Sequence, residues 1–310
     1  MKYKTALVTG GAGFIGSHVV DALIRRRIKV FVVDDLSSGS RANVNPNAHF
    51  TKLSVTNPAF ATYLKKVKPE VIFHLAAQIN LRRSVADPFH DAQVNIMGSL
   101  MIAKLAGEIG VKKIVFSSTG GPMYPESARI PYSEKNPARP LSPYGISKRT
   151  AEMYFAFAYE IFDVPYVALR YANVYGPRQN AKGEAGVISI FIERMLRGEP
   201  VKVTGNGKQT RDFVCVEDVV RANMLAMTKS VVGEFNIGTG RETDIKTIFY
   251  KLAKLTSYQF PIRYVAAPQG EVLRSALDAR KARRIFGWEP HIRLDDGLAR
   301  TVEWFRRNTL

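Results

Sequence analysis

The stretch Thr5-Ala6-Leu7-Val8-Thr9-Gly10-Gly11-Ala12-Gly13-Phe14-Ile15-Gly16 decides the fold that we expect of this chain. An apolar run of strand length leads directly into closely spaced glycines, and a helical pattern opens among them. Glycines at these positions permit a tight turn and let the backbone approach a pyrophosphate, whose charge is favoured at a helix N-terminus. The stretch therefore predicts a dinucleotide-binding strand, turn and helix.

A carboxylate follows the next predicted strand, Val30-Phe31-Val32-Val33. Asp34 ends this run, close to the offset of about 20 residues at which such a fold holds a ribose hydroxyl. An acid at this position repels a 2′-phosphate, so the pattern favours NAD over NADP as the cofactor.

Strands and helices alternate along the first half of the chain. Val71-Ile72-Phe73 and Ile114-Val115-Phe116 are typical of strands buried on both faces. Another strand is expected at about 165–170, a long loop at 119–141, and helices at about 14–27, 57–66 and 90–109. This alternation predicts an α/β fold with a Rossmann-type doubly wound parallel sheet.

The pattern becomes irregular after Asn173, where we expect a loop at 176–186 and a helix near 188–197. A smaller, irregular α/β C-terminal region is therefore expected to pack on the sheet and bind substrate. The predicted NAD-binding domain is 1–172, to which a segment at about 212–233 returns. The predicted substrate-binding region is 173–211 together with 234–310.

Composition excludes several other classes of protein. Of the 310 residues, 46% are hydrophobic and 23% are charged, as in ordinary globular proteins. The apolar runs are far shorter than the roughly 20 residues of a membrane helix, and the N-terminus has no signal-peptide pattern. The single cysteine, Cys215, excludes an internal disulfide and a multi-cysteine metal site. We expect a cytoplasmic protein with no metal and no membrane partner.

The net charge of +18 raises the question of nucleic-acid binding. The basic residues are spread along the chain, with only short clusters such as Arg25-Arg26-Arg27 and Lys281-Ala282-Arg283-Arg284. Neither cluster lies in an aromatic-rich module or a nucleic-acid-binding motif, so we expect no nucleic-acid partner. A basic surface also attracts a doubly anionic sugar nucleotide.

A tyrosine and a lysine share one face of a later predicted helix. Ser142-Pro143 begins this helix, because serine caps free backbone N–H groups and proline suits the first helical position. Tyr144 and Lys148 then stand four residues apart on one face. A lysine cation favours the phenolate of a nearby tyrosine, which makes the pair a candidate general acid and base. Taken alone, such spacing more often marks a tyrosine that packs beside a surface lysine.

Ordered motifs along nearly the whole chain resemble the extended short-chain dehydrogenase/reductases. Besides the glycine stretch and the pair Tyr144 and Lys148, the matching motifs are His74-Leu75-Ala76-Ala77, Asn95, Phe116-Ser117-Ser118-Thr119, Leu169-Arg170-Tyr171-Ala172-Asn173-Val174-Tyr175-Gly176-Pro177 and Arg211-Asp212-Phe213-Val214. Within the NAD-dependent epimerase/dehydratase family of this superfamily, the chain is most similar to UDP-glucose 4-epimerases.

The resemblance implies a set of residues around NAD. Asp34 would hold the adenosine ribose, and Lys148 would bind the nicotinamide ribose. The other residues expected to line the cofactor are Gly10, Gly13, Phe14, Ile15, Gly16, Asp35, Ser37, Ser54, Val55, Leu75, Ala76, Ala77, Gln78, Asn95, Ser117, Tyr144, Tyr171 and Val174.

The resemblance also implies the catalytic residues. Tyr144 and Lys148 would be the acid/base pair, and a hydroxyl that follows the strand at 114–116 would be the third member. Thr119 is the first choice and Ser118 the second, because the following Gly120-Gly121 permits either alignment.

On the substrate side, the resemblance implies that Thr119 and Tyr144 meet the sugar. Asn173 and Arg211 would meet the nucleotide diphosphate. The other expected substrate-binding residues are Val187, Arg274 and Ser275.

The chain departs from the family pattern at several positions. Pro268 and Gln269 stand where many relatives carry an arginine, so phosphate binding would depend more on Arg211 and Arg274. Some epimerases carry a bulky tyrosine at the position of Ser275, so the smaller serine implies that N-acetylated sugars are admitted. Other departures, which bear on affinity and substrate choice, are Ser54, Pro125, Thr204 and Cys215.

The implied activity is interconversion of UDP-glucose and UDP-galactose by transient oxidation at C4 with tightly bound NAD, in a homodimer built from the helices near 90–109 and 144–162. The N-acetylated pair of UDP-sugars is a further expected substrate. Alternatives remain open: another nucleotide-sugar epimerase, a 4,6-dehydratase, or a non-catalytic NAD-binding scaffold. Against the dehydratase, Gly120-Gly121-Pro122 stands where those enzymes usually carry an acidic pair.

Overall fold

Seven parallel strands form the centre of the protein in the computed structural model, which describes residues 3–181, 186–267 and 272–309. Their order across the sheet is β11-β6-β5-β4-β1-β2-β3, so the chain moves outward from β1 in both directions. This order confirms the predicted doubly wound α/β fold of the Rossmann type. The strands are β1 (Thr5–Thr9), β2 (Lys29–Asp34), β3 (His49–Lys52), β4 (Val71–His74), β5 (Lys113–Thr119), β6 (Tyr166–Tyr171) and β11 (Gly233–Ile237).

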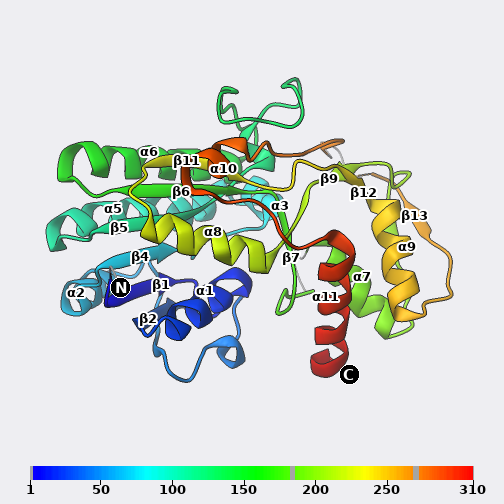
Figure 1. The fold of residues 1–310 in the computed structure, drawn as a ribbon, viewed down its shortest axis with the longest axis horizontal. Helices are drawn as coiled ribbons and strands as arrows, with labels where there is room; N and C mark the ends of the chain where they lie inside the picture. Colours follow the sequence, from blue (N-terminus) through cyan, green and yellow to red (C-terminus); the bar gives the residue numbers. More distant parts are fainter. Residues whose placement is uncertain (1–2, 182–185, 268–271, 310) are drawn as a thin grey trace.

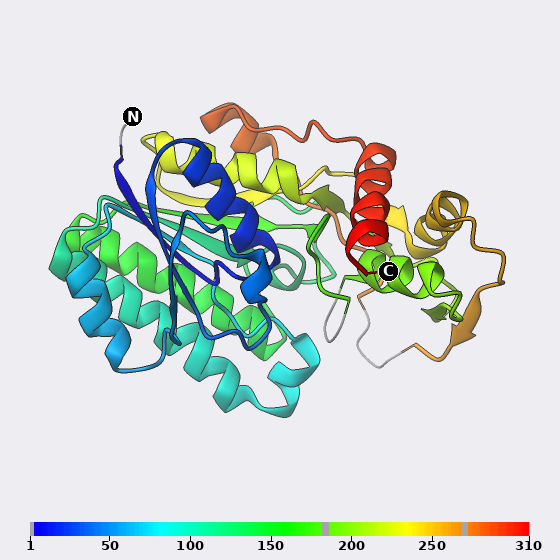
Figure 2. The ribbon, with the colours of Figure 1, turned by 90° about the horizontal axis from the view of Figure 1, so that it is seen from below.

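Helices cover both faces of this sheet. Figure 2 shows α1 (Phe14–Arg25) and α8 (Val216–Thr228) on one face, and α2 (Ala59–Val67), α5 (Gly98–Ile109) and α6 (Pro143–Phe162) on the other. Because side chains alternate along a strand, successive residues enter different layers. Val8 and Val32 belong to the core that contains α1 and α8, whereas Leu7 and Val33 belong to the opposite core. The continuous apolar runs in the sequence follow from burial on both faces.

The remaining elements form a second region, to the right of the sheet in Figure 1. It has its own apolar core, in which Ile192, Phe249 and Leu298 are buried. The chain enters it directly from the end of β6. Its elements are β7 (Asn173–Tyr175), α7 (Val187–Leu196), β8 (Lys202–Thr204), β9 (Thr210–Arg211), β10 (Phe213–Cys215), β12 (Thr243–Asp244), α9 (Ile245–Thr256), β13 (Arg263–Val265) and α11 (Leu294–Thr309).

Some expected boundaries differ from the structure. The helix expected at 90–109 comprises α4 (Pro88–Ala92), a π-helical turn at Gln93–Met97 and α5. The sequence did not predict α3 (Leu81–Ala86) or the edge strand β3, whose half-polar residues carry no strong strand pattern. Within 119–141, β5 reaches Thr119 and a short 3-10 turn spans Gly121–Met123. The segment expected to return to the sheet at about 212–233 extends to Ile237, because β11 pairs with β6. Further along the chain, α10 (Arg280–Phe286) also packs against β11.

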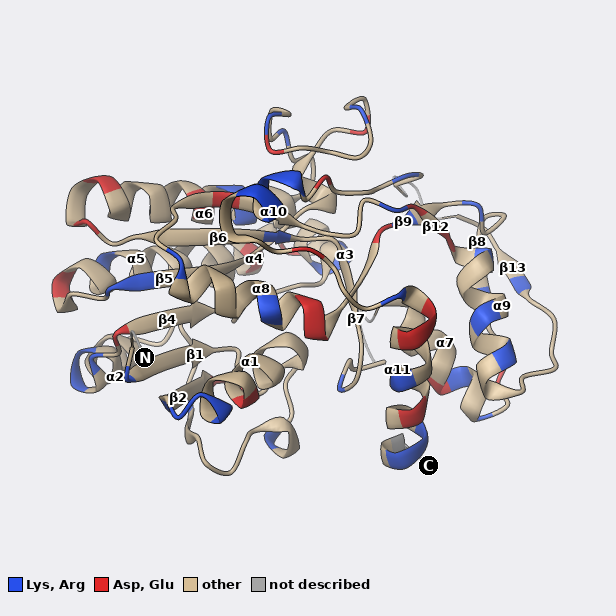
Figure 3. Ribbon diagram, in the orientation of Figure 1, with Lys and Arg blue, Asp and Glu red and all other residues tan. Residues whose placement is uncertain are grey.

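Charged residues are distributed over the whole molecule. Figure 3 shows lysine and arginine on helices of both regions, including α9, α10 and α11. Among the residues that the structure describes, no helix is both long enough and apolar enough to cross a membrane.

Candidate active site

The turn between β1 and α1 is shaped for a negatively charged group. Gly10 has a φ of +71°, and a Cβ atom there would lie 2.6 Å from the backbone nitrogen of Ala76. A Cβ on Gly16 would collide with the carbonyl oxygen of Gly10. Gly13 is the N-cap of α1 and has no side chain that could satisfy the first N–H groups of the helix. These N–H groups are therefore available to a pyrophosphate.

Asp34 lies at the carboxyl end of β2, beside this turn. Its carboxylate accepts hydrogen bonds from the backbone N–H of Ala12 at 2.9 Å and of Leu36 at 2.8 Å. Burial raises the pKa of Asp34, and the two N–H groups oppose that rise. Each carboxylate oxygen keeps a further lone pair for a ribose hydroxyl. The glycine turn and Asp34 together fit the adenosine diphosphate part of NAD.

The two candidate acid/base residues lie in the first turns of α6. The predicted helix start is confirmed, because the Ser142 hydroxyl accepts a hydrogen bond from the N–H of Gly145 at 3.2 Å. The Nζ atom of Lys148 donates to the carbonyl oxygen of Ser117 at 2.9 Å. The same Nζ atom lies 5.9 Å from the centre of the Tyr144 ring.

Burial favours the neutral form of both groups, so it shifts their pKa values in opposite directions. It raises the pKa of Tyr144 to about 12, an effect opposed by a hydrogen bond with Thr119 and reinforced by the charge of Asp91. It lowers the pKa of Lys148 to about 8, while Asp91 and Glu152 act in the opposite direction. A positive charge brought beside the pair would favour the phenolate of Tyr144.

The two candidate hydroxyls at the end of β5 have different partners. Thr119 hydrogen-bonds with Tyr144. Ser118 instead donates to Oε1 of the fully buried Glu152 at 2.7 Å. Arg170 holds the same carboxylate, with Nε–Oε1 and Nη2–Oε2 distances of 2.8 and 2.7 Å. The structure therefore brings Thr119 to Tyr144, whereas the second choice, Ser118, faces a buried ion pair.

Sequence reasoning missed Asp91 in α4, which is fully buried near the pair. Its Oδ1 atom accepts hydrogen bonds from Gln78 Nε2 at 2.9 Å and Asn95 Nδ2 at 3.0 Å. Its Oδ2 atom accepts a hydrogen bond from the Ser147 hydroxyl at 2.6 Å. The available signal was the four-residue spacing of Asp91 and Asn95, which places two polar side chains on one helical face.

His74, at the end of β4, is buried, and no role was predicted for it beyond its place in a motif. The His74 ring lies 2.8 Å from Thr9 Oγ1 through Nδ1, and 3.0 Å from Ser99 Oγ through Nε2. Burial, reinforced by the charge of Lys148, lowers the pKa of His74 to about 3. The imidazole is therefore neutral at physiological pH, and it links β1, β4 and α5.

The expected phosphate-binding arginines lie in or near the second region. Arg274 is exposed and forms a two-pronged ion pair with Glu242, with Nε–Oε1 at 2.9 Å and Nη2–Oε2 at 2.6 Å. Arg211 is half-buried in β9 and donates to the carbonyl oxygen of Thr210 at 2.8 Å. Pro268 and Gln269 lie outside the described residues.

Two further predicted residues bear on the substrate. Asn173 is exposed at the start of β7. Ser275 is buried near the end of β5, since a Cβ atom on Gly121 would lie 3.4 Å from its hydroxyl oxygen.

The remaining predicted residues lie within the strands, directly after them, or at the starts of helices and turns. Gln78 and Asn95 bind each other, because the N–H of Gln78 donates to Asn95 Oδ1 and Asn95 Nδ2 donates to the Gln78 carbonyl, both at 2.9 Å. Tyr171 is buried, and its hydroxyl accepts a hydrogen bond from Asn223 at 2.9 Å. Phe14 and Ile15 open α1, Val187 opens α7, Asp35 and Ser37 follow β2, Ser54 and Val55 follow β3, Leu75, Ala76 and Ala77 follow β4, Ser117 lies in β5, and Val174 lies in β7.

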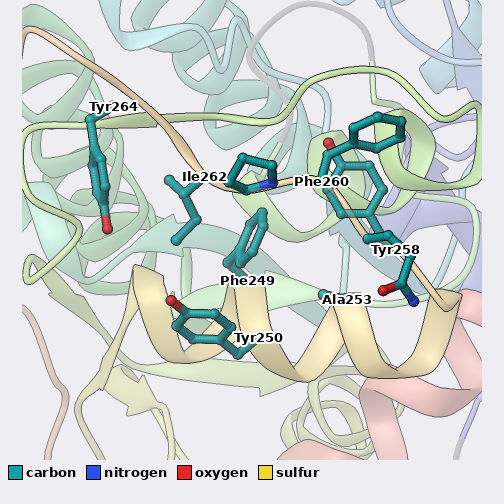
Figure 4. Close-up of a pocket in the computed structure, with 9 residues that line it drawn as sticks. Phe249, Tyr250, Ala253, Tyr258, Phe260, Ile262 and Tyr264 are labelled. Atoms are coloured by element: carbon teal, nitrogen blue, oxygen red, sulfur yellow. The ribbon is translucent and has the colours of Figure 1, made fainter.

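A separate cavity of about 470 Å³ lies between α9 and the segment 258–264. Figure 4 shows the rings of Phe249, Tyr250, Tyr258, Phe260 and Tyr264 around it. None of the predicted site residues lines this cavity. It is distinct from the group around Tyr144.

Most of the chain matches a known protein family, and nearly all of it matches a known enzyme. The model of the NAD dependent epimerase/dehydratase family matches residues 6–238. A UDP-glucose 4-epimerase from Mycolicibacterium smegmatis is 41% identical over 309 residues, which cover 98% of this chain and 99% of that protein.

Two solved structures are similar over almost the whole chain. The UDP-glucose 4-epimerase of Thermotoga maritima, crystallised with UDP-glucose, has 48% identity and a TM-score of 0.97, covering 99% of this chain and 100% of that one. A UDP-N-acetylglucosamine 4-epimerase from Methanobrevibacter ruminantium, in complex with UDP-N-acetylmuramic acid, has 34% identity and a TM-score of 0.93, covering 99% of each chain.

Proposed function

Because this chain belongs to the NAD dependent epimerase/dehydratase family, we propose that it is a UDP-sugar 4-epimerase that interconverts UDP-glucose and UDP-galactose. The observation that carries the proposal is the convergence of Tyr144, Lys148 and Thr119 at the carboxyl end of β5. In doubly wound sheets this edge is where ligands bind. The similarity to UDP-glucose 4-epimerases over the full chain supports the same reaction.

Tyr144 is the proposed general base and acid. NAD, when bound, supplies the acceptor and donor of the hydride at C4 of the sugar. As the phenolate, Tyr144 takes the proton of the C4 hydroxyl, and it returns that proton when the sugar is reduced on its other face. Lys148 stabilises the phenolate by its charge, and Thr119 orients the hydroxyl through its hydrogen bond with Tyr144. The net redox change is zero, so the cofactor is retained throughout the cycle.

The nucleotide part of the substrate is proposed to be anchored in the second region. Arg211 and Arg274 carry the forked N–H donors that suit a diphosphate, and Arg274 would exchange its ion pair with Glu242 for the phosphate. Asn173 is exposed on β7, which pairs with β10 directly after Asp212. Anchoring the nucleotide supplies binding energy remote from the reacting carbon. The hexose is then free to turn, which presents either face of C4 to the cofactor.

N-acetylated sugars are proposed as further substrates. Ser275 is small and buried close to Gly121, at the end of the strand that carries Thr119. A serine leaves room there for a 2-acetamido group that a tyrosine would exclude. A similar solved structure is a UDP-N-acetylglucosamine 4-epimerase. Absence of turnover of UDP-N-acetylglucosamine would contradict this assignment.

A homodimer is proposed through α5 and α6. On α6, Met153, Phe157 and Ile161 are 58%, 46% and 61% exposed, and their four-residue spacing forms one apolar stripe. Met97, just before α5, is 49% exposed. Such a stripe on α6, together with Met97 at the entry to α5, fits burial against a second copy of the chain. Light scattering should give twice the chain mass, and Phe157→Glu should shift it toward the monomer.

A cytoplasmic location is also proposed. Cys215 is buried, and burial raises the pKa of its thiol to about 11, so the thiol stays protonated and unreactive. A chain whose only cysteine is buried needs no oxidising compartment. Cell fractionation with an antibody to the protein tests the location.

A panel of substrates tests the proposed reaction and its alternatives. Purified protein with NAD is incubated with UDP-glucose, UDP-N-acetylglucosamine and UDP-glucuronate, and the C4 epimers are resolved by chromatography. Epimers of either of the first two sugars support the proposal. Epimers of UDP-glucuronate alone would assign another epimerase, a 4-keto-6-deoxy product a dehydratase, and no conversion a non-catalytic scaffold.

A further inference from the structure

Asp91 is a carboxylate held entirely by neutral groups. It is fully buried, and its donors are Gln78, Asn95 and Ser147, at 2.9, 3.0 and 2.6 Å. These donors come from three segments: the loop after β4, the π-helical turn and α6. Three donors of this kind satisfy both oxygens of the carboxylate at a position that water does not reach.

The negative charge of Asp91 acts on both members of the acid/base pair. Ser147, which donates to Asp91, immediately precedes Lys148 on α6. The charge raises the pKa values of Tyr144 and Lys148. Among the residues that the structure describes, the hydrogen-bond donors to Asp91 are all neutral, and no cation forms an ion pair with it that would cancel this effect.

Other charged groups near Lys148 are balanced or neutral. Glu152 is bound by both Arg149 and Arg170. His74 on β4 is neutral, because burial lowers its pKa to about 3. On the helices packed against the start of α6, the remaining titratable side chains are Arg82, Arg83 and Asp87, which are exposed, and His90, which is half-buried.

We propose that Asp91 is a positioning residue of this site: its buried charge keeps Lys148 in the ammonium form, and its hydrogen bonds fix the first turns of α6 against the loop after β4. The proposal rests on the epimerase function proposed above. It assigns to Asp91 an electrostatic role that a purely structural hydrogen-bond acceptor does not have.

The pH dependence of turnover distinguishes these roles. A nearby negative charge raises the pKa of any acid, so Asp91→Asn should lower the pKa values of Tyr144 and Lys148 together. The whole pH profile of kcat should then move to lower pH by about one unit, the lower end of the shift that one neighbouring charge causes. Activity relative to wild type should be higher at pH 6 than at pH 8.5. Asp87→Asn, an exposed carboxylate at the N-cap of the same helix, is the matched control and should leave the profile unchanged.

A second variant covers the case in which Asp91→Asn does not fold or loses NAD. Ser147→Ala removes one donor but keeps the charge, so the carboxylate acts more strongly on Lys148 and the profile should move to higher pH. An Asp91→Asn profile that keeps its wild-type position, with only a uniform loss of kcat, would overturn the proposal. Where Asp91→Asn does not fold or loses NAD, a Ser147→Ala profile that keeps its wild-type position would overturn it. A wild-type protein with no epimerase activity would instead refute the proposed function, so the two failures are distinguishable.

Discussion

Thr119 and Ser118 are consecutive hydroxyls with opposite expected roles, and replacing each in turn separates catalysis from stability. Thr119→Val keeps the shape of the side chain and removes its hydrogen bond with Tyr144. Ser118→Ala removes a 2.7 Å hydrogen bond to the buried carboxylate of Glu152. The two variants alter the same strand end, so each is a control for the other.

The expected magnitudes follow from these contacts. Loss of one preorganised hydrogen bond at the reacting group lowers kcat by about 10²- to 10³-fold, or roughly 3–4 kcal/mol of transition-state stabilisation. Thr119→Val should therefore show this loss with little change in stability. A hydrogen bond to a charged group contributes about 1.5–3 kcal/mol. Ser118→Ala should lower the free energy of unfolding by that amount while kcat stays within about threefold of wild type.

The assays are initial rates of UDP-sugar epimerisation and urea unfolding of the NAD-bound protein. Because the Thr119 hydrogen bond lowers the pKa of Tyr144, the acidic limb of the Thr119→Val pH profile should also move to higher pH. A Ser118→Ala variant as inactive as Thr119→Val, or a Thr119→Val variant with wild-type turnover, would refute the reasoning.

Three further predictions concern the scaffold around the site. Glu152→Leu should lower the unfolding free energy by about 3–5 kcal/mol, because it leaves Arg170 charged and buried without its partner. The double variant Glu152→Leu with Arg170→Met should recover most of that free energy, as measured by urea unfolding. Gly10→Ala should abolish NAD retention, measured by absorbance at 260 nm, because the added Cβ atom collides with the backbone of Ala76. Gly110 has the same φ of +71° but open space around a Cβ atom, so the control Gly110→Ala should lose only about 1–2 kcal/mol of unfolding free energy. His74 has a folded-state pKa of about 3, below its value in the unfolded chain, so the stability that neutral His74 contributes is present above pH 6.5 and is lost as pH falls. By pH 5 this loss is about 2 kcal/mol of unfolding free energy. His74→Gln should remove that part of the pH dependence of the unfolding free energy.

The fold was predictable because its signals are local. Apolar runs such as Val71–Phe73 are buried on both faces of the sheet, and the glycine turn sits between a strand and a helix as its spacing requires. The edge strand β3 was missed, since only one side of it pairs with the sheet and its residues are half polar. The division into an NAD-binding domain and a substrate-binding region stays a prediction.

The site was predictable only in part. The cap at Ser142 places Tyr144 and Lys148 in the first turns of one helix, on the same face. That placement can be predicted from local sequence, without knowledge of the tertiary structure. The choice between two hydroxyls depends on which face of β5 each occupies, and the sequence leaves that open. Asp91 owes its importance to donors from three separate segments, which only the folded chain brings together.

Substitution of Tyr144 by phenylalanine tests the central claim most directly. The variant keeps the ring that packs in the site and removes only the hydroxyl that takes up and returns the proton. With NAD bound and UDP-glucose as substrate, the wild-type protein should form UDP-galactose. Tyr144→Phe should retain the cofactor and form no detectable C4 epimer; near wild-type turnover in this variant would contradict the account.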